Sequence, residues 1–341
     1  ISAHAQEAMS IEGQLKNGTA GAEVPQGVTV TLKVYNAGQV QETREAVSDA
    51  EGGFSFEAVP GGEGFGYVIS ADYAGGFYAF ESDYPLPPEP VEMMVYESTS
   101  STEAIEVRSH TLVVETADSN TRLMNTWEMV WLENTGDRTF VPDLASGGSM
   151  EVLRFSLPAT ARDLEVQSNL LGGQVLRVDV GFGIITPVPP GSHEIDYTYL
   201  SSYADGKLTF AHSFPFGADT FRVFLREGLG QVTGTGLQEM EPLVDEGGNR
   251  YRQLEGNNLS AGVKITLDFS GLPEPSLWGR WQDSVPGGNL TMVAIPVALG
   301  MALLALLAYV FFRKRRRLSR ATAAVSGDPA QHTALTEALA H

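Results

Sequence analysis

A run of 23 residues without a charged side chain, followed at once by a basic cluster, constrains this chain more than any other feature. The run extends from Leu290 to Phe312. As a helix it would be about 34 Å long, because each residue adds about 1.5 Å. That length crosses a hydrocarbon core of ~30 Å, whereas a buried helix of a soluble protein usually has polar interruptions. The sequence therefore predicts a transmembrane helix over residues 290–312.

The basic cluster predicts the orientation of that helix. Basic residues that flank a span stay on the cytoplasmic side. Residues 313–341 are therefore expected to form a basic cytoplasmic tail, and the long N-terminal part to lie outside the plasma membrane. Trp278 and Trp281, in a juxtamembrane segment over residues 273–289, are typical of the outer membrane interface. The basic residues of this predicted single-pass anchor in the lipid bilayer are Arg313, Lys314, Arg315, Arg316 and Arg317.

The other end of the chain favours export. Ala3-His4-Ala5 has the A-x-A pattern of a signal-peptidase site. Residues 1–10 are therefore expected to be the remnant of a signal peptide and an N-terminal arm, with the mature protein beginning at Gln6.

Charge and cysteine content exclude several classes of function. The chain has 42 acidic and 22 basic residues, and six of the basic ones lie between positions 313 and 320. The predicted external part is thus strongly anionic and would repel a phosphate backbone, which argues against nucleic acid as a partner. The chain has no cysteine, so disulfides, thiolate zinc sites and a cysteine nucleophile are all excluded.

Short alternating runs predict an all-β fold of two or more β-sandwich domains, followed by the transmembrane helix. In the first predicted domain, residues 11–98, Val30, Leu32 and Val34 alternate with polar residues, as in a strand with one buried face. A turn is expected from Asp49 through Gly53, after which Phe54 and Phe56 return to the core. Residues 99–108 are expected to be a polar linker.

The first domain resembles the carboxypeptidase regulatory-like domain, a transthyretin-like β-sandwich. The resemblance covers about 70 residues, and its most specific part is the segment from Asp49 to Phe56. The resemblance implies an accessory or adhesive module without an activity of its own. The matching residues are Gly13, Val28, Val30, Leu32, Asp49, Gly53, Phe54, Phe56, Val59, Pro60 and Gly61.

Residues 109–272 show further alternation and predict a second β-sandwich region, either one large sandwich or two small ones. Five sets of residues are each expected to share one face of a strand. These sets are Trp127, Met129 and Trp131; Leu153, Phe155 and Leu157; Ile195, Tyr197 and Tyr199; Leu208, Phe210, His212 and Phe214; and Val263, Ile265, Leu267 and Phe269.

No residue pattern in this region predicts catalysis, a cofactor or a metal ion. His193 and Glu194 are metal-ligand types, but neighbours on a strand point to opposite faces. His212 lies among apolar residues and is expected to be a core histidine, with no acidic residue on the same face. The sequence also lacks a G-x-S-x-G nucleophile elbow. We therefore expect a protein that is not an enzyme.

Two binding functions remain open for such a chain. The first is a membrane-anchored extracytoplasmic scaffold or accessory subunit that binds a protein partner within a membrane or envelope complex. The alternative is a surface protein for glycan binding or adhesion, which would use exposed aromatic rings. Trp127 and Trp131 are expected in the core because Met129 lies between them. Their exposure would favour the glycan alternative.

Overall fold

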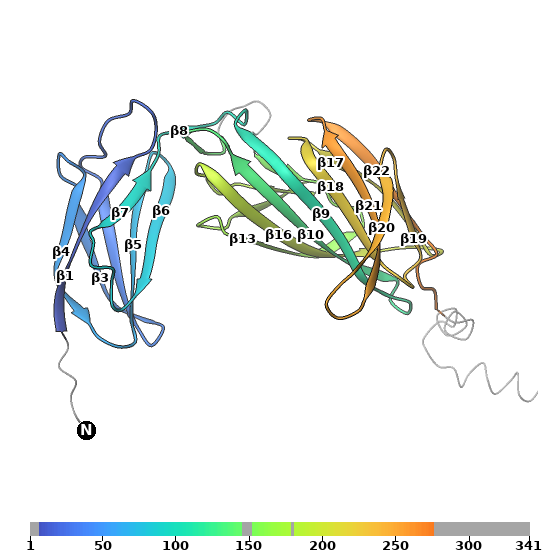
Figure 1. Ribbon diagram of the computed structural model, residues 1–341, viewed down its shortest axis with the longest axis horizontal. Coiled ribbons are helices and arrows are strands. Elements are labelled where there is room, and N and C mark those ends of the chain that lie inside the picture. The colour runs from blue at the N-terminus through green and yellow to red at the C-terminus, as the bar shows by residue number, and fades with distance from the viewer. Residues whose placement is uncertain (1–6, 145–151, 179–180, 276–341) are drawn as a thin grey trace, which may run out of the picture. The chain divides into compact units, whose positions relative to one another are not determined.

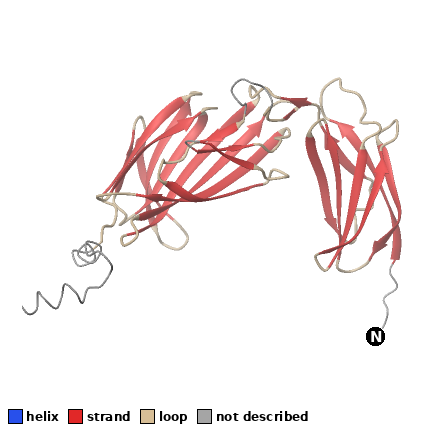
Figure 2. Ribbon diagram, turned by 180° about the vertical axis from the view of Figure 1, so that it is seen from behind, coloured by secondary structure: helices blue, strands red, loops and turns tan. Residues whose placement is uncertain are grey.

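The computed structural model describes residues 7–144, 152–178 and 181–275, and within these ranges all regular structure is β-strand (Figures 1 and 2). The all-β prediction is confirmed for this part of the chain. Within the described ranges, no helix is long and apolar enough to cross a membrane. The predicted span and its flanking residues, from Trp278 to the C-terminus, lie outside the described residues.

The first sandwich consists of two facing sheets. One has the order β4-β1-β7 and the other the order β3-β2-β5-β6. β1 pairs with β4 in antiparallel and with β7 in parallel orientation. The strands are β1 (Glu7–Asn17), β2 (Thr29–Asn36), β3 (Gln39–Val47), β4 (Gly53–Gly61), β5 (Phe65–Tyr73), β6 (Gly76–Asp83) and β7 (Val91–Val95).

The predicted turn before β4 is present and positions two core rings. The Oδ1 atom of Asp49 accepts hydrogen bonds from the backbone N–H groups of Glu51 at 3.0 Å and Gly53 at 2.7 Å. Gly52 has a φ of 80°, a conformation that glycine adopts without strain. Phe54 and Phe56 are buried after the turn, and their rings meet edge to face with centroids 6.0 Å apart.

The second sandwich has a seven-stranded sheet on one side, in the order β13-β16-β10-β9-β18-β21-β20. Two three-stranded sheets, β12-β15-β14 and β17-β22-β19, are also present. The strands of the large sheet are β9 (Ile105–Asp118), β10 (Leu123–Asn134), β13 (Ala161–Ser168), β16 (Gly191–Ser202), β18 (Ala218–Arg226), β20 (Gln238–Val244) and β21 (Arg250–Leu259). The others are β12 (Leu153–Phe155), β14 (Val175–Val178), β15 (Gly181–Ile184), β17 (Lys207–Phe214), β19 (Gln231–Gly234) and β22 (Val263–Ser270).

One continuous hydrophobic core extends from Ile105 to Leu272, so this region has a single core rather than two small ones. β9 begins at Ile105, inside the segment 99–108 that was expected to be a linker. The segment before it contributes β8 (Ser98–Thr99), which pairs with β11 (Thr139–Phe140). A separate core, from Ile11 to Val95, fills the first sandwich.

The alternation in β10 has the opposite sense to the one expected. Thr126, Glu128 and Val130 are each 0 % exposed, whereas Trp127 is 36 % and Trp131 43 % exposed. The prediction that the tryptophans lie in the core is therefore wrong. β10 has apolar residues on both faces. Met124 and Leu132, which are buried, have the same parity along the strand as Glu128, so Glu128 and not the tryptophans lies on the core face.

Candidate functional site: a buried carboxylate and an exposed aromatic face

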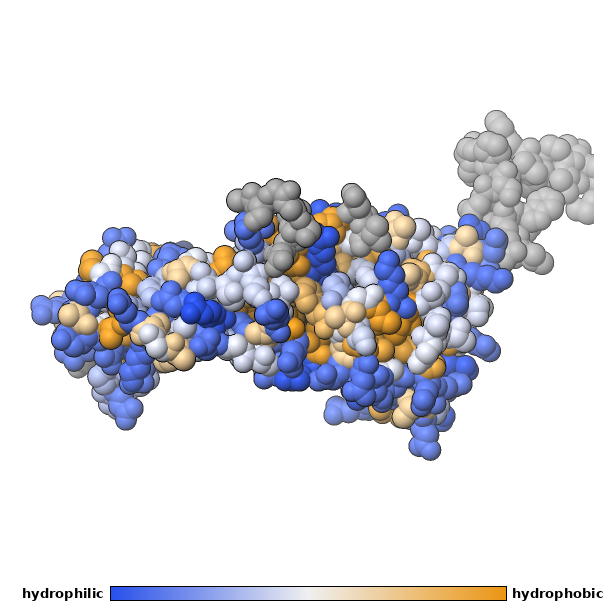
Figure 3. Space-filling view, turned by 90° about the horizontal axis from the view of Figure 1, so that it is seen from above, coloured by the Kyte–Doolittle hydropathy of each residue, from blue (hydrophilic) through white to orange (hydrophobic). Residues whose placement is uncertain are grey.

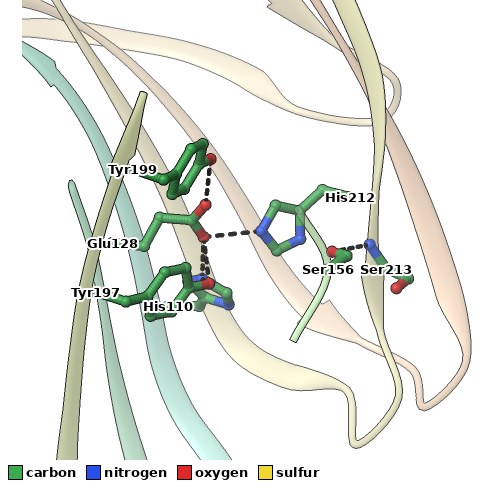
Figure 4. Close-up of polar contacts among 7 residues, drawn as sticks. All are labelled: His110, Glu128, Ser156, Tyr197, Tyr199, His212 and Ser213. Carbon is green, nitrogen blue, oxygen red and sulfur yellow. Dashed lines mark hydrogen bonds and ion pairs between the residues drawn. The ribbon is translucent and has the colours of Figure 1, made fainter. Parts of the chain in front are cut away.

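A carboxylate lies at the centre of the second sandwich, between the two layers. Glu128 comes from β10, His110 from the neighbouring β9, and His212 from β17 in one of the small sheets. Figure 4 shows both imidazole rings and the rings of Tyr197 and Tyr199 directed at the Glu128 carboxylate. All five side chains are buried, with exposures between 0 and 4 %.

Four hydrogen bonds converge on this carboxylate. Its Oε2 atom lies 2.6 Å from Nε2 of His110 and 2.9 Å from Nε2 of His212. Oε2 also accepts from the hydroxyl of Tyr197 at 2.7 Å, and Oε1 accepts from the hydroxyl of Tyr199 at 2.6 Å. Because an ionised carboxylate only accepts, each Nε2 carries the hydrogen that it donates. The short distances are typical of charge-assisted hydrogen bonds.

The environment keeps Glu128 ionised and both tyrosines protonated. Burial raises the pKa of Glu128, but the interactions with His212 and His110, including a hydrogen bond from each imidazole, lower it by more, so its pKa lies below the usual value. Burial, with the nearby Glu128 charge, raises the pKa of Tyr197 and Tyr199. Burial lowers the pKa of His110 despite its bond to Glu128. One negative charge therefore lies in an apolar interior, stabilised by fixed donors.

The sequence did not predict this cluster, and the expectation that His212 has no acidic partner is wrong. His110, Glu128 and His212 form a group whose potential metal-ligand atoms all lie within 4.8 Å of one another. The signal was the alternation of Met124, Val130 and Leu132, which places Glu128 on the core face. Trp127 and Trp131, at the alternate positions of the strand, favoured the opposite assignment of the buried face.

His193 does not belong to this cluster. It is 8 % exposed, and its Nε2 atom lies 2.8 Å from the carbonyl oxygen of Pro189. Glu194 and Asp196 have the opposite parity on β16 and are partly exposed. The three side chains therefore do not converge, as the strand geometry predicted.

The outer face of the seven-stranded sheet, on the side away from the core, presents a row of large side chains. Trp127, Met129 and Trp131 form its centre on β10. On the β16 side they lie opposite Thr198, Asp196 and Glu194, in that order. On the β9 side they lie opposite Val113, Thr111 and Ser109. Opposed residues in a sheet share a face, so the row of Trp127, Met129 and Trp131 has polar side chains beside it at every position except Val113.

The outer face continues onto β18 and β21. Phe224 and Arg222 on β18 lie beside Val113 and Thr111 of β9. Arg222 donates from Nε to Glu255 on β21 at 2.8 Å. A view from above, which does not single out this face, shows apolar residues gathered over the second sandwich with hydrophilic residues around them (Figure 3).

No protein-family model matches the chain, and no curated protein matches it. The carboxypeptidase regulatory-like family therefore remains a prediction for the first domain. Among solved structures, an M1 zinc metallopeptidase from Deinococcus radiodurans is similar with 10 % identity and a TM-score of 0.30. That match covers 49 % of this chain and 42 % of the metallopeptidase, so the chain spans about two fifths of the metallopeptidase's length.

Two surface proteins are also among the similar structures. The serine-rich repeat adhesion glycoprotein Srr1 of Streptococcus agalactiae has 10 % identity and a TM-score of 0.19, over 61 % of this chain and 91 % of its own. The major pilin subunit BcpA of Bacillus cereus has 12 % identity and a TM-score of 0.20, over 78 % of this chain and 86 % of its own. These TM-scores are too low to carry an argument about activity.

Proposed function

We propose that this chain is a membrane-tethered surface protein that binds neutral carbohydrate through the outer face of its seven-stranded sheet and does not turn it over. The observation that carries the proposal is the exposure of Trp127 and Trp131 on one sheet face. A tryptophan ring exposed on a rigid strand offers a flat apolar surface on which a sugar ring can stack. Its desolvation on binding is favourable.

The spacing of the two rings fits an extended saccharide. Trp127 and Trp131 are four residues apart on β10, which corresponds to roughly 13 Å along the strand. Glu194 and Thr198, opposite them on β16, supply oxygen atoms that sugar hydroxyls can reach. The excess of acidic residues over the whole chain favours neutral over anionic sugars.

We further propose that the chain does not hydrolyse the carbohydrate that it binds. Catalysis needs a polar group that substrate can reach. The His110, Glu128 and His212 cluster, which has the residue types of an acid–base site, is sealed between the sheets. Membrane tethering rests on the uncharged run 290–312 and its basic flank.

A protein partner is the second candidate for the same face. Trp, Met and Arg are enriched at protein interfaces, and this face carries Trp127, Met129, Trp131 and Arg222. The scaffold or accessory-subunit function predicted from the sequence would use this surface in that case.

A glycan array with the full chain in detergent tests the proposal. We expect binding to neutral polysaccharides and loss of that binding in the Trp127→Ala, Trp131→Ala double variant. Phe77→Ala is a matched control, because Phe77 is an exposed aromatic residue of the first sandwich at 39 % exposure. No glycan binding by the folded wild type, together with a co-purifying protein that the double variant loses, would favour the protein partner.

A further inference from the structure

We infer that His110, Glu128 and His212 form a structural binding site for a divalent transition-metal ion such as Zn²⁺, held inside the second sandwich. The three side chains supply two imidazole nitrogens and one carboxylate oxygen, the ligand types that Zn²⁺ binds in proteins. They come from three different strands, two in the large sheet and one in an opposing sheet. An ion at this point would therefore join the two layers.

The distances place the ligand atoms almost where an ion needs them. Oε2 of Glu128 lies 2.6 and 2.9 Å from the two Nε2 atoms. In a tetrahedral site with metal–ligand bonds of about 2.0–2.1 Å, neighbouring ligand atoms lie roughly 3.3 Å apart. Entry of an ion therefore requires Oε2 to move away from each Nε2 by roughly half an ångström, while the three ligand atoms, which all lie within 4.8 Å of one another, gather around the ion.

Two further contacts suit a bound ion. The hydroxyl of Tyr197 lies 2.7 Å from the same Oε2 atom and 3.2 Å from Nε2 of His110, a position from which it can become a fourth ligand. Tyr199 donates to the other oxygen, Oε1. In a metal site this second contact would orient the carboxylate, as outer-shell hydrogen bonds do.

Charge also favours a cation here. Buried charges in proteins are paired or coordinate metal ions. The ion pairs of Glu128 in the described part of the chain are both with histidines, and neither lysine nor arginine takes part in them. On binding, the hydrogen of each neutral imidazole moves from Nε2 to Nδ1, so that the freed Nε2 lone pairs and the carboxylate hold the ion.

The side chains of the site are buried among the residues that the structure describes. We therefore expect the ion to bind as the chain folds, as in other structural metal sites. Refolding with metal can therefore be measured without any enzymatic activity.

The test is refolding with and without metal. The full chain in detergent is unfolded with a chelator, freed of metal, and refolded with Co²⁺ or Zn²⁺. We expect one ion per chain after removal of free metal, a higher Tm than for the metal-free chain, and the visible absorption of tetrahedral Co²⁺ with N and O ligands. His212→Gln should lose all three, whereas His193→Gln should keep them, because His193 is buried outside the cluster.

The Co²⁺ spectrum of the wild type keeps the test decisive even if His212→Gln fails to refold. A wild type that refolds in stoichiometric Co²⁺ without retaining it would overturn the inference. Ion retention that is equal in the wild type and His212→Gln, without the tetrahedral spectrum, would also overturn it, since this is what the acidic surface alone would give.

Discussion

Replacing Glu128 by glutamine tests how much the buried carboxylate contributes to stability. Glutamine keeps the shape of the side chain but offers one acceptor oxygen in place of two, and its amide group donates. Two imidazoles and two hydroxyls now donate to this carboxylate. In Glu128→Gln several of these donors would face an NH₂ group. Breaking a buried charge network in this way costs about 3–5 kcal/mol.

Thermal unfolding of the purified chain measures this cost. For a domain the size of the second sandwich, 3–5 kcal/mol corresponds to a fall in Tm of roughly 6–20 °C. Glu133→Gln is the matched control on the same strand. Glu133 pairs at the surface with Arg108, at 2.5 Å with side-chain exposures of 33 and 46 %, and such pairs contribute ~0–1 kcal/mol. A Glu128→Gln variant as stable as Glu133→Gln would refute the argument that the carboxylate organises this core.

Three further predictions concern the core of the first sandwich, acid stability and topology. Phe56→Ala should destabilise the chain by ~3–5 kcal/mol, as large-to-small core substitutions do, and an unchanged denaturation midpoint would show that Phe56 is not in the core. The pKa of His110 and that of His193 are lowered by burial, so the folded state binds fewer protons than the unfolded state. Their contribution to stability is present above the unfolded pKa of about 6.5 and is lost as the pH falls below it. Urea denaturation at pH 8, 6.5 and 5 should show this fall, and a flat profile would contradict it. Protease added to spheroplasts should digest residues 6–289 and spare the tail after Arg313. A protected external part with a cleaved tail would reverse the orientation.

Much of the fold could be predicted from the sequence, because strand alternation and turn chemistry are local signals. The turn at Asp49, the burial of Phe54 and Phe56, and the inward sets on β16, β17 and β22 follow from period two and from residues that permit tight turns. The sequence could not show that residues 105–272 share a single core, because the sheets pair strands that are far apart in the chain. β9 pairs with β18, for example, across about 110 residues.

The candidate site was hidden for a specific physical reason. When large apolar residues occupy both the odd and the even positions of a strand, the sequence does not show which face is buried. In β10, Trp127 and Trp131 favoured the face that is in fact exposed. A charged residue in the middle of an apolar strand is usually taken as the exposed one. Glu128 is the opposite case, since four donors from three other strands stabilise its charge inside the core.

The direct test of the proposed function is the affinity of the full chain for the neutral polysaccharide that it binds best, measured for graded substitutions at Trp131. Trp131→Phe retains an aromatic ring and should weaken binding only modestly. Trp131→Ala removes the ring and should weaken binding at least about tenfold, as expected for an anchoring tryptophan worth more than ~1.4 kcal/mol. The control Phe77→Ala should leave the affinity unchanged. Equal affinities of the wild type and Trp131→Ala, with both proteins folded, would contradict the proposal that the outer face of the seven-stranded sheet binds carbohydrate.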